Sequence, residues 1–175
     1  MAASVKLDVW YDKGLSFTCT QCGNCCTGGP GYVWISDEEV ARLAEHLGLS
    51  EKETRRRHVR RVAGGQSLKE VRRAGKYDCA FLTGDPQQPG GKRGCSIYAA
   101  RPLQCRTWPF WPENLTEDGW QDAKQTCPGL GKGTRYTAEQ IEAIRDAADW
   151  PERPPSSTPP TASIRKLPSR RTASG

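Results

Sequence analysis

Half of the cysteines in this chain lie within one eight-residue stretch, Cys19 to Cys26. Two residues separate Cys19 from Cys22 and Cys22 from Cys25, a spacing that lets one loop turn several thiols toward a single centre, as in zinc and iron–sulfur sites. Cys26 directly follows Cys25, and because neighbouring side chains point apart, the two thiols are expected to serve different centres. The stretch therefore predicts metal ligation rather than core packing.

The other four cysteines are spread along the rest of the chain, at Cys79, Cys95, Cys105 and Cys127. With eight cysteines and only two histidines, the soft donors are almost all sulfur, which suits zinc or an iron–sulfur cluster. Cys127 is followed by Pro128, as is the remote fourth ligand of bacterial ferredoxins. We therefore hypothesise two centres, one held by Cys19, Cys22, Cys25 and Cys127 and the other by Cys26, Cys79, Cys95 and Cys105.

Two arginines, Arg101 and Arg106, flank Cys105. Four thiolates bring negative charge to a metal centre and a nearby guanidinium offsets it, so both arginines are predicted to contact the cofactor. The alternative is a surface pair or a contact that stabilises a turn. The stiff, apolar run from Trp108 to Pro112 is predicted to pack in the core; in the alternative interpretation its rings keep water away from the metal.

The composition predicts a loop-rich protein of the cytosol. Hydrophobic residues make up 35% of the 175 residues, and there are 18 glycines and 13 prolines, so stability is expected to depend on the cysteine centre. No apolar run approaches the eighteen residues of a membrane span, and charged residues stand where a signal peptide would be apolar. In a reducing compartment, metal ligation is favoured over a disulfide framework, which is the minor alternative.

Positive charge is concentrated in two places. The Pro/Ser/Thr-rich segment 151–175 carries five basic residues and one acidic residue, which gives it four of the six net positive charges, and it is predicted to be a disordered tail after a cysteine-cluster domain of residues 1–150. The run from Arg55 to Arg61 is interpreted as a solvated helix face. An anionic partner such as RNA is the minor alternative, because no aromatic residues alternate with these arginines. Apart from this alternative, we expect the binding partner to be a protein or a redox partner.

The hydrophobic pattern predicts a small, irregular α+β domain with about three helices. Ser36 and Glu39 form a capping box before a helix that ends at Gly48. Ser50 and Glu53 repeat the signal for a helix through about Val62, and Thr137 with Gln140 begins a last one. The strands and loops are predicted as an edge strand in 5–18, a buried segment at 32–35, a hairpin of 67–71 with 77–82, an exposed loop at 85–94, and a polar loop before Cys127.

The order of the motifs resembles a known family. The series is Cys19-x2-Cys22-x2-Cys25-Cys26, then Cys95-x-Ile97-Tyr98-x2-Arg101-Pro102-x2-Cys105-Arg106 with Trp108-Pro109, then Cys127-Pro128-Gly129. Over about residues 15–149 it is similar to the YkgJ family, also described as a zinc- or iron-chelating CxxCxxCC domain and related to flagellin lysine N-methylase (FliB). The resemblance implies a metal-binding, small bacterial cytosolic protein, but it implies no particular reaction.

Three functions follow from these observations. The first is an iron–sulfur protein with one or two [4Fe–4S] clusters, which serves electron transfer, sensing or metal handling. The second is a zinc-stabilised module that binds an anionic partner. The third is a protein lysine N-methyltransferase, against which the short chain and the lack of a recognisable methyl-donor site both count.

Overall fold

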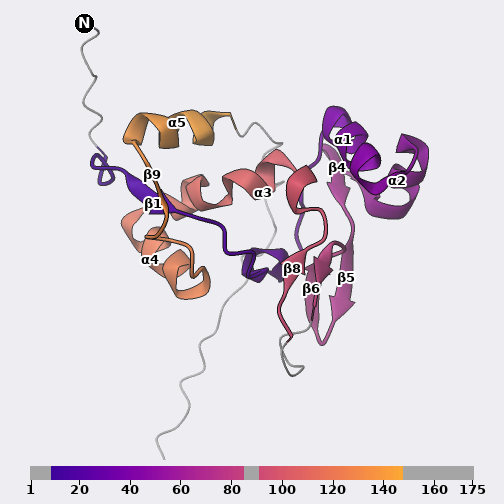
Figure 1. Ribbon diagram of the computed structural model, residues 1–175, viewed down its shortest axis with the longest axis horizontal. Coiled ribbons are helices and arrows are strands. Elements are labelled where there is room, and N and C mark those ends of the chain that lie inside the picture. The colour runs from indigo at the N-terminus through magenta and orange to yellow at the C-terminus, as the bar shows by residue number, and fades with distance from the viewer. Residues whose placement is uncertain (1–8, 85–90, 148–175) are drawn as a thin grey trace, which may run out of the picture.

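The computed structural model describes residues 9–84 and 91–147 and shows a mixed α+β domain (Figure 1), which confirms the predicted fold class. The described part contains five α-helices and nine short strands. The helices are α1 (Asp37–Leu47), α2 (Glu51–His58), α3 (Leu103–Thr107), α4 (Glu117–Thr126) and α5 (Ala138–Asp146). Four 3₁₀ turns lie between them, η1 (Asn24–Cys26), η2 (Tyr98–Ala100), η3 (Trp108–Phe110) and η4 (Pro112–Asn114).

The strands form four small antiparallel sheets. Two of them are the pair β1 (Leu15–Phe17) with β9 (Thr134–Tyr136) and the three-stranded sheet β2 (Thr27–Gly28), β6 (Lys76–Cys79) and β5 (Glu70–Arg73). The other two are the hairpin β3 (Val59–Val62) with β4 (Gly65–Leu68) and the pair β7 (Leu82–Thr83) with β8 (Gly94–Cys95). The predicted hairpin is present as β5 and β6, with Glu70 opposite Cys79, but its bounds differ from 67–71 and 77–82 because Ser67 and Leu68 pair with β3 instead.

Two of the predicted helix starts have the expected capping boxes. Ser36 accepts the backbone N–H of Glu39 while the Glu39 side chain accepts that of Ser36, and α1 ends at Gly48 in the left-handed conformation. Thr137 and Gln140 form the same reciprocal pair at α5. Hydrogen bonds between residues three positions apart thus determine where α1 and α5 begin.

Three other local predictions differ from the structure. The second helix ends at His58, because the β-branched Val59 pairs with Leu68 in the β3–β4 hairpin. The polar segment before Cys127 is helix α4 rather than a loop, since Thr116 caps it and Trp120 is buried against the core. The predicted edge strand is confined to Leu15–Phe17 within its described part.

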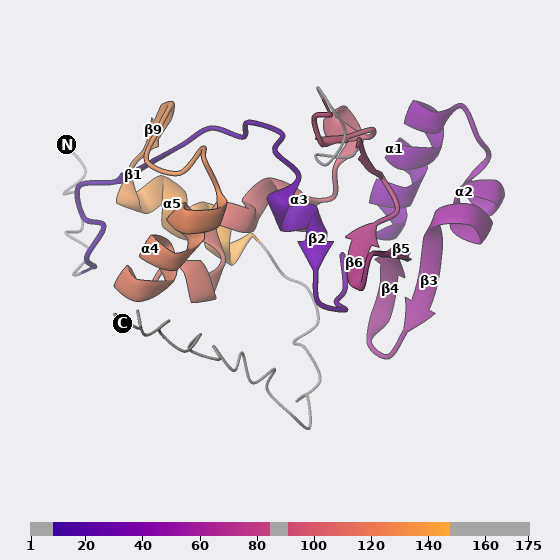
Figure 2. The same ribbon diagram turned by 90° about the horizontal axis from the view of Figure 1, so that it is seen from below.

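Two separate hydrophobic cores divide the molecule into halves, at opposite ends of its long axis in Figures 1 and 2. We call residues 9–18 and 108–147 the aromatic half, whose core contains Phe110 and Trp120. We call residues 27–84 and 91–100 the sheet half, whose core contains Leu43 and Leu68. The cysteine loop 19–26 and helix α3 lie between the two halves (Figures 1 and 2).

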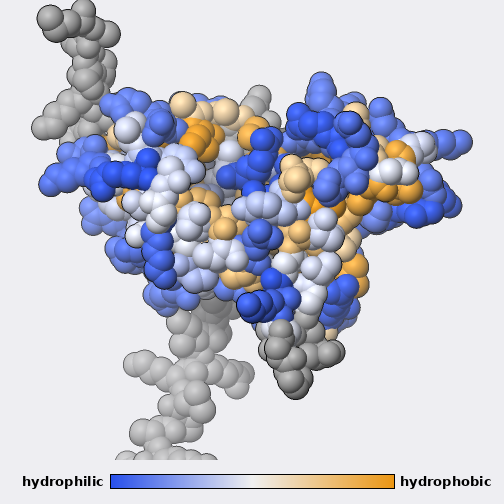
Figure 3. Space-filling model, viewed as in Figure 1, coloured by the Kyte–Doolittle hydropathy of each residue, from blue (hydrophilic) through white to orange (hydrophobic). Residues whose placement is uncertain are grey.

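The surface between and around these cores is mostly polar. On the face shown in Figure 3, hydrophilic residues predominate and hydrophobic residues form small separate areas. No helix in the described part is both long enough and apolar enough to cross a membrane. The predicted tail 151–175 and most of the predicted loop 85–94 lie outside the described residues.

Candidate metal centre

A cavity of about 270 Å³ opens between the two halves, and five of the eight cysteines line it. These are Cys19, Cys22, Cys25, Cys105 and Cys127. All four thiols assigned from sequence to a first centre are therefore on the wall of one cavity, together with Cys105. The described residues that line the cavity include no Asp, Glu or His, so the soft donors that face it are thiols.

The cysteine loop reaches this cavity through a tight turn. Gly23 has a left-handed backbone (φ 71°), and a Cβ there would lie 2.6 Å from a methyl group of Leu82. The next residue, Asn24, donates its side-chain N–H to the carbonyl of Thr126 at 2.5 Å and accepts a hydrogen bond from Arg93. Asn24 thus fastens the loop to the end of α4 on one side and to the sheet half on the other.

Cys127 is brought to the cavity by α4 and by a turn that packs closely against β1. Its backbone N–H bonds to the carbonyl of Ala123 at 2.8 Å, so Cys127 is the cap at the end of α4. The chain then turns at Gly129, where a Cβ would lie 1.9 Å from the carbonyl oxygen of Thr18. Only glycine permits that approach, and it places Cys127 beside the strand that leads into Cys19.

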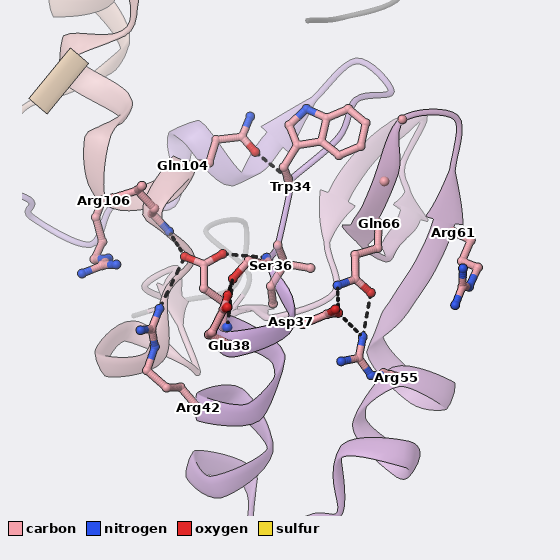
Figure 4. A pocket seen from close by; sticks show the side chains of 15 residues that line it. Trp34, Ser36, Asp37, Glu38, Arg42, Arg55, Arg61, Gln66, Gln104 and Arg106 are labelled. Carbon is pink, nitrogen blue, oxygen red and sulfur yellow. Dashed lines mark hydrogen bonds and ion pairs between the residues drawn. The ribbon is translucent and has the colours of Figure 1, made fainter. Parts of the chain in front are cut away.

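Helix α3 carries Cys105 and is held by the sheet half through buried polar groups (Figure 4). The carboxylate of Glu39 accepts the backbone N–H of Leu103 at 2.6 Å in addition to completing its own capping box. The side-chain oxygen of Gln104 accepts the backbone N–H of Trp34 at 2.6 Å. These bonds fix the position and rotation of α3, and so the direction from which Cys105 enters the cavity.

The groove drawn in Figure 4 has a volume of about 880 Å³ and is larger than the sulfur-lined cavity. Its charged groups largely pair with one another: Arg55 contacts Asp37 at 3.0 Å and Arg42 contacts Glu39 at 3.6 Å. The first pair connects α1 to α2, and Gln66 on β4 is hydrogen-bonded to both of its members. We therefore interpret the groove as a structural network, and the smaller cavity as the site with reactive donors.

The remaining three cysteines do not line the cavity: Cys26 ends the cysteine loop, and Cys79 and Cys95 come from the sheet half. Cys79 is the last residue of β6 and Cys95 the last of β8, and both pack against the sheet core. Cys26 ends the 3₁₀ turn η1, with its Sγ 3.9 Å from that of Cys25. The second predicted set, which also includes Cys105, thus lies toward the sheet half.

Burial and mutual repulsion raise the pKa values of several thiols, whereas a hydrogen bond lowers the pKa of Cys25. The hydrogen bond from Cys26 lowers the pKa of Cys25 to about 7, and the same bond raises that of Cys26. Burial raises the pKa of Cys79 to about 11, with a smaller contribution from Cys95 and Cys25. Burial also raises the pKa of Cys105, to which Cys79, Cys25 and Cys95 add. The thiols therefore interact as one electrostatic group in which Cys25 joins both sets.

The same influences act where the cysteine loop meets α4. Burial raises the pKa of the Cys127 thiol, and the Cys22 and Cys25 thiolates raise it further. Cys22 and Cys127 are therefore close enough to repel each other when ionised. A cation placed between them would reverse this repulsion.

The two predicted cofactor arginines both line the cavity but are held differently. Arg101 donates from Nη1 to the Cys19 Sγ at 3.7 Å and from Nε to the carbonyl of Tyr98 at 2.8 Å. The side chain of Arg106 is exposed and has no hydrogen-bond or ion-pair partner among the described residues. Tyr98 and Asn24 are site residues that the sequence reasoning did not single out; Tyr98 lies inside the quoted motif, whereas Asn24 carries no such signal.

The thiols do not form a preassembled coordination sphere. In the two described ranges, no group of three or more Cys, His, Asp or Glu side chains has the geometry to hold a metal ion as it stands. Metal binding would require thiol side chains on the cavity wall to turn inward. The cysteine loop and the exposed position of Cys25 are suited to that adjustment.

Comparison with known proteins agrees with the donor set. Residues 18–128 match the family model "CxxCxxCC: Putative zinc- or iron-chelating domain". A relative from Methanocaldococcus jannaschii, named "Uncharacterized protein MJ0661", is 34% identical over 137 residues, which are 74% of this chain and 65% of that protein. The chain thus spans about two thirds of the length of this relative. No solved structure matches.

Proposed function

We propose that this chain, which belongs to the CxxCxxCC family of zinc- or iron-chelating domains, binds iron–sulfur clusters between its two halves and serves in redox chemistry, sensing or metal handling. In this proposal Cys19, Cys22, Cys25 and Cys127 hold one cluster. Cys26, Cys79, Cys95 and Cys105 hold a second cluster on the side of the sheet half.

The observation that carries the proposal is the collection of five thiols from three separate segments on the wall of one cavity. The cavity's volume of about 270 Å³ is more than a single tetrahedral ion requires. The volume favours a multi-atom cluster over one zinc ion. Thiolate donors and the two arginines that face them also fit the net negative charge of such a cluster.

When bound, an iron–sulfur cluster supplies one-electron transfer. The protein's part is to shield the site and to balance its charge. Trp108 and Pro109 form an apolar section of the cavity wall that limits the entry of water. Arg101 supplies positive charge that lowers the pKa of Cys25 after the larger effect of the Cys26 hydrogen bond.

The proposal is tested by anaerobic purification followed by measurement of iron, acid-labile sulfide and the visible spectrum. Iron with equimolar sulfide and a broad charge-transfer absorption is expected. Colourless protein with stoichiometric zinc would reject the cluster and leave the zinc-stabilised module. That alternative has support from the family description, which names zinc as well as iron.

The partition into two centres is tested by single variants from each set. Cys22→Ser should lower the metal content by one centre and Cys79→Ser by the other, whereas His46→Gln, at an exposed position on α1, should leave it unchanged. A total of one metal per chain, or loss of all metal in every cysteine variant, would reject the two-centre assignment.

The other predicted functions are weaker proposals. The arginines of α2 are paired with acids on the same helix, Arg55 with Glu51 and Arg57 with Glu53, which supports a solvated face rather than an RNA-binding one. A protein lysine methyltransferase would need a methyl-donor site as well as the metal. Methyl transfer from S-adenosylmethionine to purified flagellin is the assay for that activity.

A further inference from the structure

Arg101 is fixed in place by the residue three positions before it. Its guanidinium carbon lies 3.6 Å from the centroid of the Tyr98 ring, and its Nε donates to the Tyr98 carbonyl at 2.8 Å. One face and one edge of the guanidinium are therefore occupied by a single residue of the η2 turn. The side chain is left with one rotational position.

In that position the arginine reaches one particular sulfur. Its Nη1 lies 3.7 Å from the Cys19 Sγ, which is within hydrogen-bond distance for a sulfur acceptor. Tyr98 and Cys19 also line the same cavity. The Cys19 sulfur, which comes from the cysteine loop, thus receives a directed hydrogen bond from Arg101.

Arg106 lies at the same site as Arg101 but lacks its contacts, so the two arginines can be compared. It lines the same cavity and carries the same charge, but its exposed side chain has neither an aromatic face beneath it nor a hydrogen-bonded partner among the described residues. If charge compensation were the whole role of the arginines, Arg101 would not need the stacking and the carbonyl contact. This difference between the two arginines indicates that the Tyr98 contacts direct the hydrogen bond from Arg101 to Cys19.

We infer that Tyr98 and Arg101 form one positioning unit, in which Tyr98 holds Arg101 so that it donates a hydrogen bond to the Cys19 sulfur and thereby sets how tightly the metal centre is held and how readily it is reduced. The inference rests on the proposed function, since it concerns a ligand of the same site. A hydrogen bond withdraws electron density from a thiolate sulfur, which stabilises the reduced, more negative state of a cluster. It also orients the ligand, so its loss weakens metal binding.

The experiment separates a directional bond from simple charge. Arg101→Lys keeps the charge but loses the planar fork and the stacked face, and Arg101→Gln loses both. Tyr98→Leu removes the surface that positions the arginine, and Tyr98→Phe removes only the hydroxyl. Arg106→Gln is the matched control, because it removes an equal charge from the same cavity.

Each full-length variant is purified anaerobically and its metal content is measured, followed by the rate of metal transfer to a chelator and, for an iron-containing centre, the midpoint potential. Arg101→Lys, Arg101→Gln and Tyr98→Leu are expected to release metal about 10- to 100-fold faster than the unmodified protein, with a lower midpoint potential. Arg106→Gln and Tyr98→Phe are expected to change the rate less than Arg101→Lys does.

Normal release rate and potential in Arg101→Lys would overturn the inference, because charge alone would then suffice. Equal effects in Arg106→Gln and Arg101→Gln would do the same. If Arg101→Gln fails to fold, Tyr98→Leu decides, since Arg101 and its charge are retained there. Unmodified protein without bound metal would instead reject the proposed function itself, and this inference with it.

Discussion

The two halves of the molecule are stabilised by different kinds of core. In the aromatic half, Phe110 stacks parallel to Trp120 at 6.4 Å and meets Tyr136 edge-on at 5.0 Å. The core of the sheet half is mainly aliphatic, with Leu43 and Leu68 almost completely buried. Each half also has cysteines next to its core, so the halves differ in packing but both supply candidate ligands.

This comparison indicates how the site is assembled. Cys127 packs against the aromatic core, whereas Cys79 and Cys95 pack against the sheet core. Neither core extends across the cavity, and among the described residues the polar bonds of α3 and of the cysteine loop help to join the halves. A metal bound by thiols from both sides would act as the main cross-link.

Chelation of the metal is expected to give the largest effect on stability. Apparent binding free energies of structural metal sites are on the order of 10 kcal/mol, and they contribute directly to folding when ligands come from separate segments. Treatment with a chelator under anaerobic conditions should therefore lower Tm steeply and broaden the transition, as the two cores separate. The change in Tm is measured by recording circular dichroism during thermal unfolding.

A variant that already lacks one ligand from each half, Cys127→Ser with Cys79→Ser, is the control and should show little further change on chelation. A chelated sample of the unmodified protein with an unchanged melting profile would contradict the cross-link. The halves would then be held together by protein contacts alone.

Truncating one buried side chain in each core should have the next largest effect on the free energy of unfolding. The two variants should also differ in how much metal they retain. Phe110→Ala is expected to cost about 3 to 5 kcal/mol and Leu68→Ala about 2 to 5 kcal/mol, because both side chains are nearly fully buried. Phe110 follows Pro109 on the cavity wall, so its loss should also reduce metal retention. Leu68 lies on β4 and does not line the cavity, so its truncation should reduce metal retention less than Phe110→Ala does.

Urea unfolding gives the change in stability, and metal analysis of the purified variants gives the second readout. Equal loss of metal from both variants would show that the sheet half and the aromatic half are not independent. The comparison between the halves would then lose its structural basis.

The sequence predicted the parts of the fold that depend on short-range chemistry. The capping boxes at Ser36 and Thr137 require only residues three positions apart, and both are present. The ends of other elements depend on distant partners. Val59 leaves the helical pattern because Leu68 pairs with it, and α4 is stabilised by burial of Trp120 rather than by its polar sequence.

The candidate ligands were visible from sequence because thiols in close spacing have few other uses. Their grouping was not derivable in the same way, since it depends on which segments meet. The approach of Gly129 to Thr18 brings Cys127 to the cysteine loop, and no local pattern encodes that contact. Asn24 joins the loop to α4 for the same nonlocal reason, and its role was therefore missed.

Glu39 offers a test of smaller magnitude, because it connects the sheet half to the helix that carries Cys105. Its carboxylate is buried and accepts N–H groups from Ser36 and Leu103. Glu39→Ala leaves the Leu103 donor without its partner and should cost about 1 to 3 kcal/mol. Glu38→Ala is the control, since that exposed carboxylate contacts the Ser36 hydroxyl instead. Equal shifts in the urea midpoint for both variants would show that the α3 contact is unimportant.

The smallest expected effects depend on pH and act in opposite directions in the two halves. In the aromatic half, burial and the hydrogen bond to Glu142 raise the pKa of Tyr11 from its ordinary value near 10 to about 12. The folded state therefore holds this proton more tightly than the unfolded state. The resulting stabilisation is complete below pH 10 and is lost as the pH rises toward 12.

In the sheet half, hydrogen bonds from Gln66 and Arg55 hold the pKa of Asp37 below its ordinary value, so its contribution is present at neutral pH and is lost on acidification. Tm measured against pH should therefore fall less steeply in Tyr11→Phe above pH 10 and in Asp37→Asn below about pH 4. Thiol ionisation also changes stability in alkali, but it is common to the unmodified protein and Tyr11→Phe, so the difference between them isolates the tyrosine. Parallel curves for the two proteins would mean that the contact between Tyr11 and Glu142 does not stabilise the aromatic half.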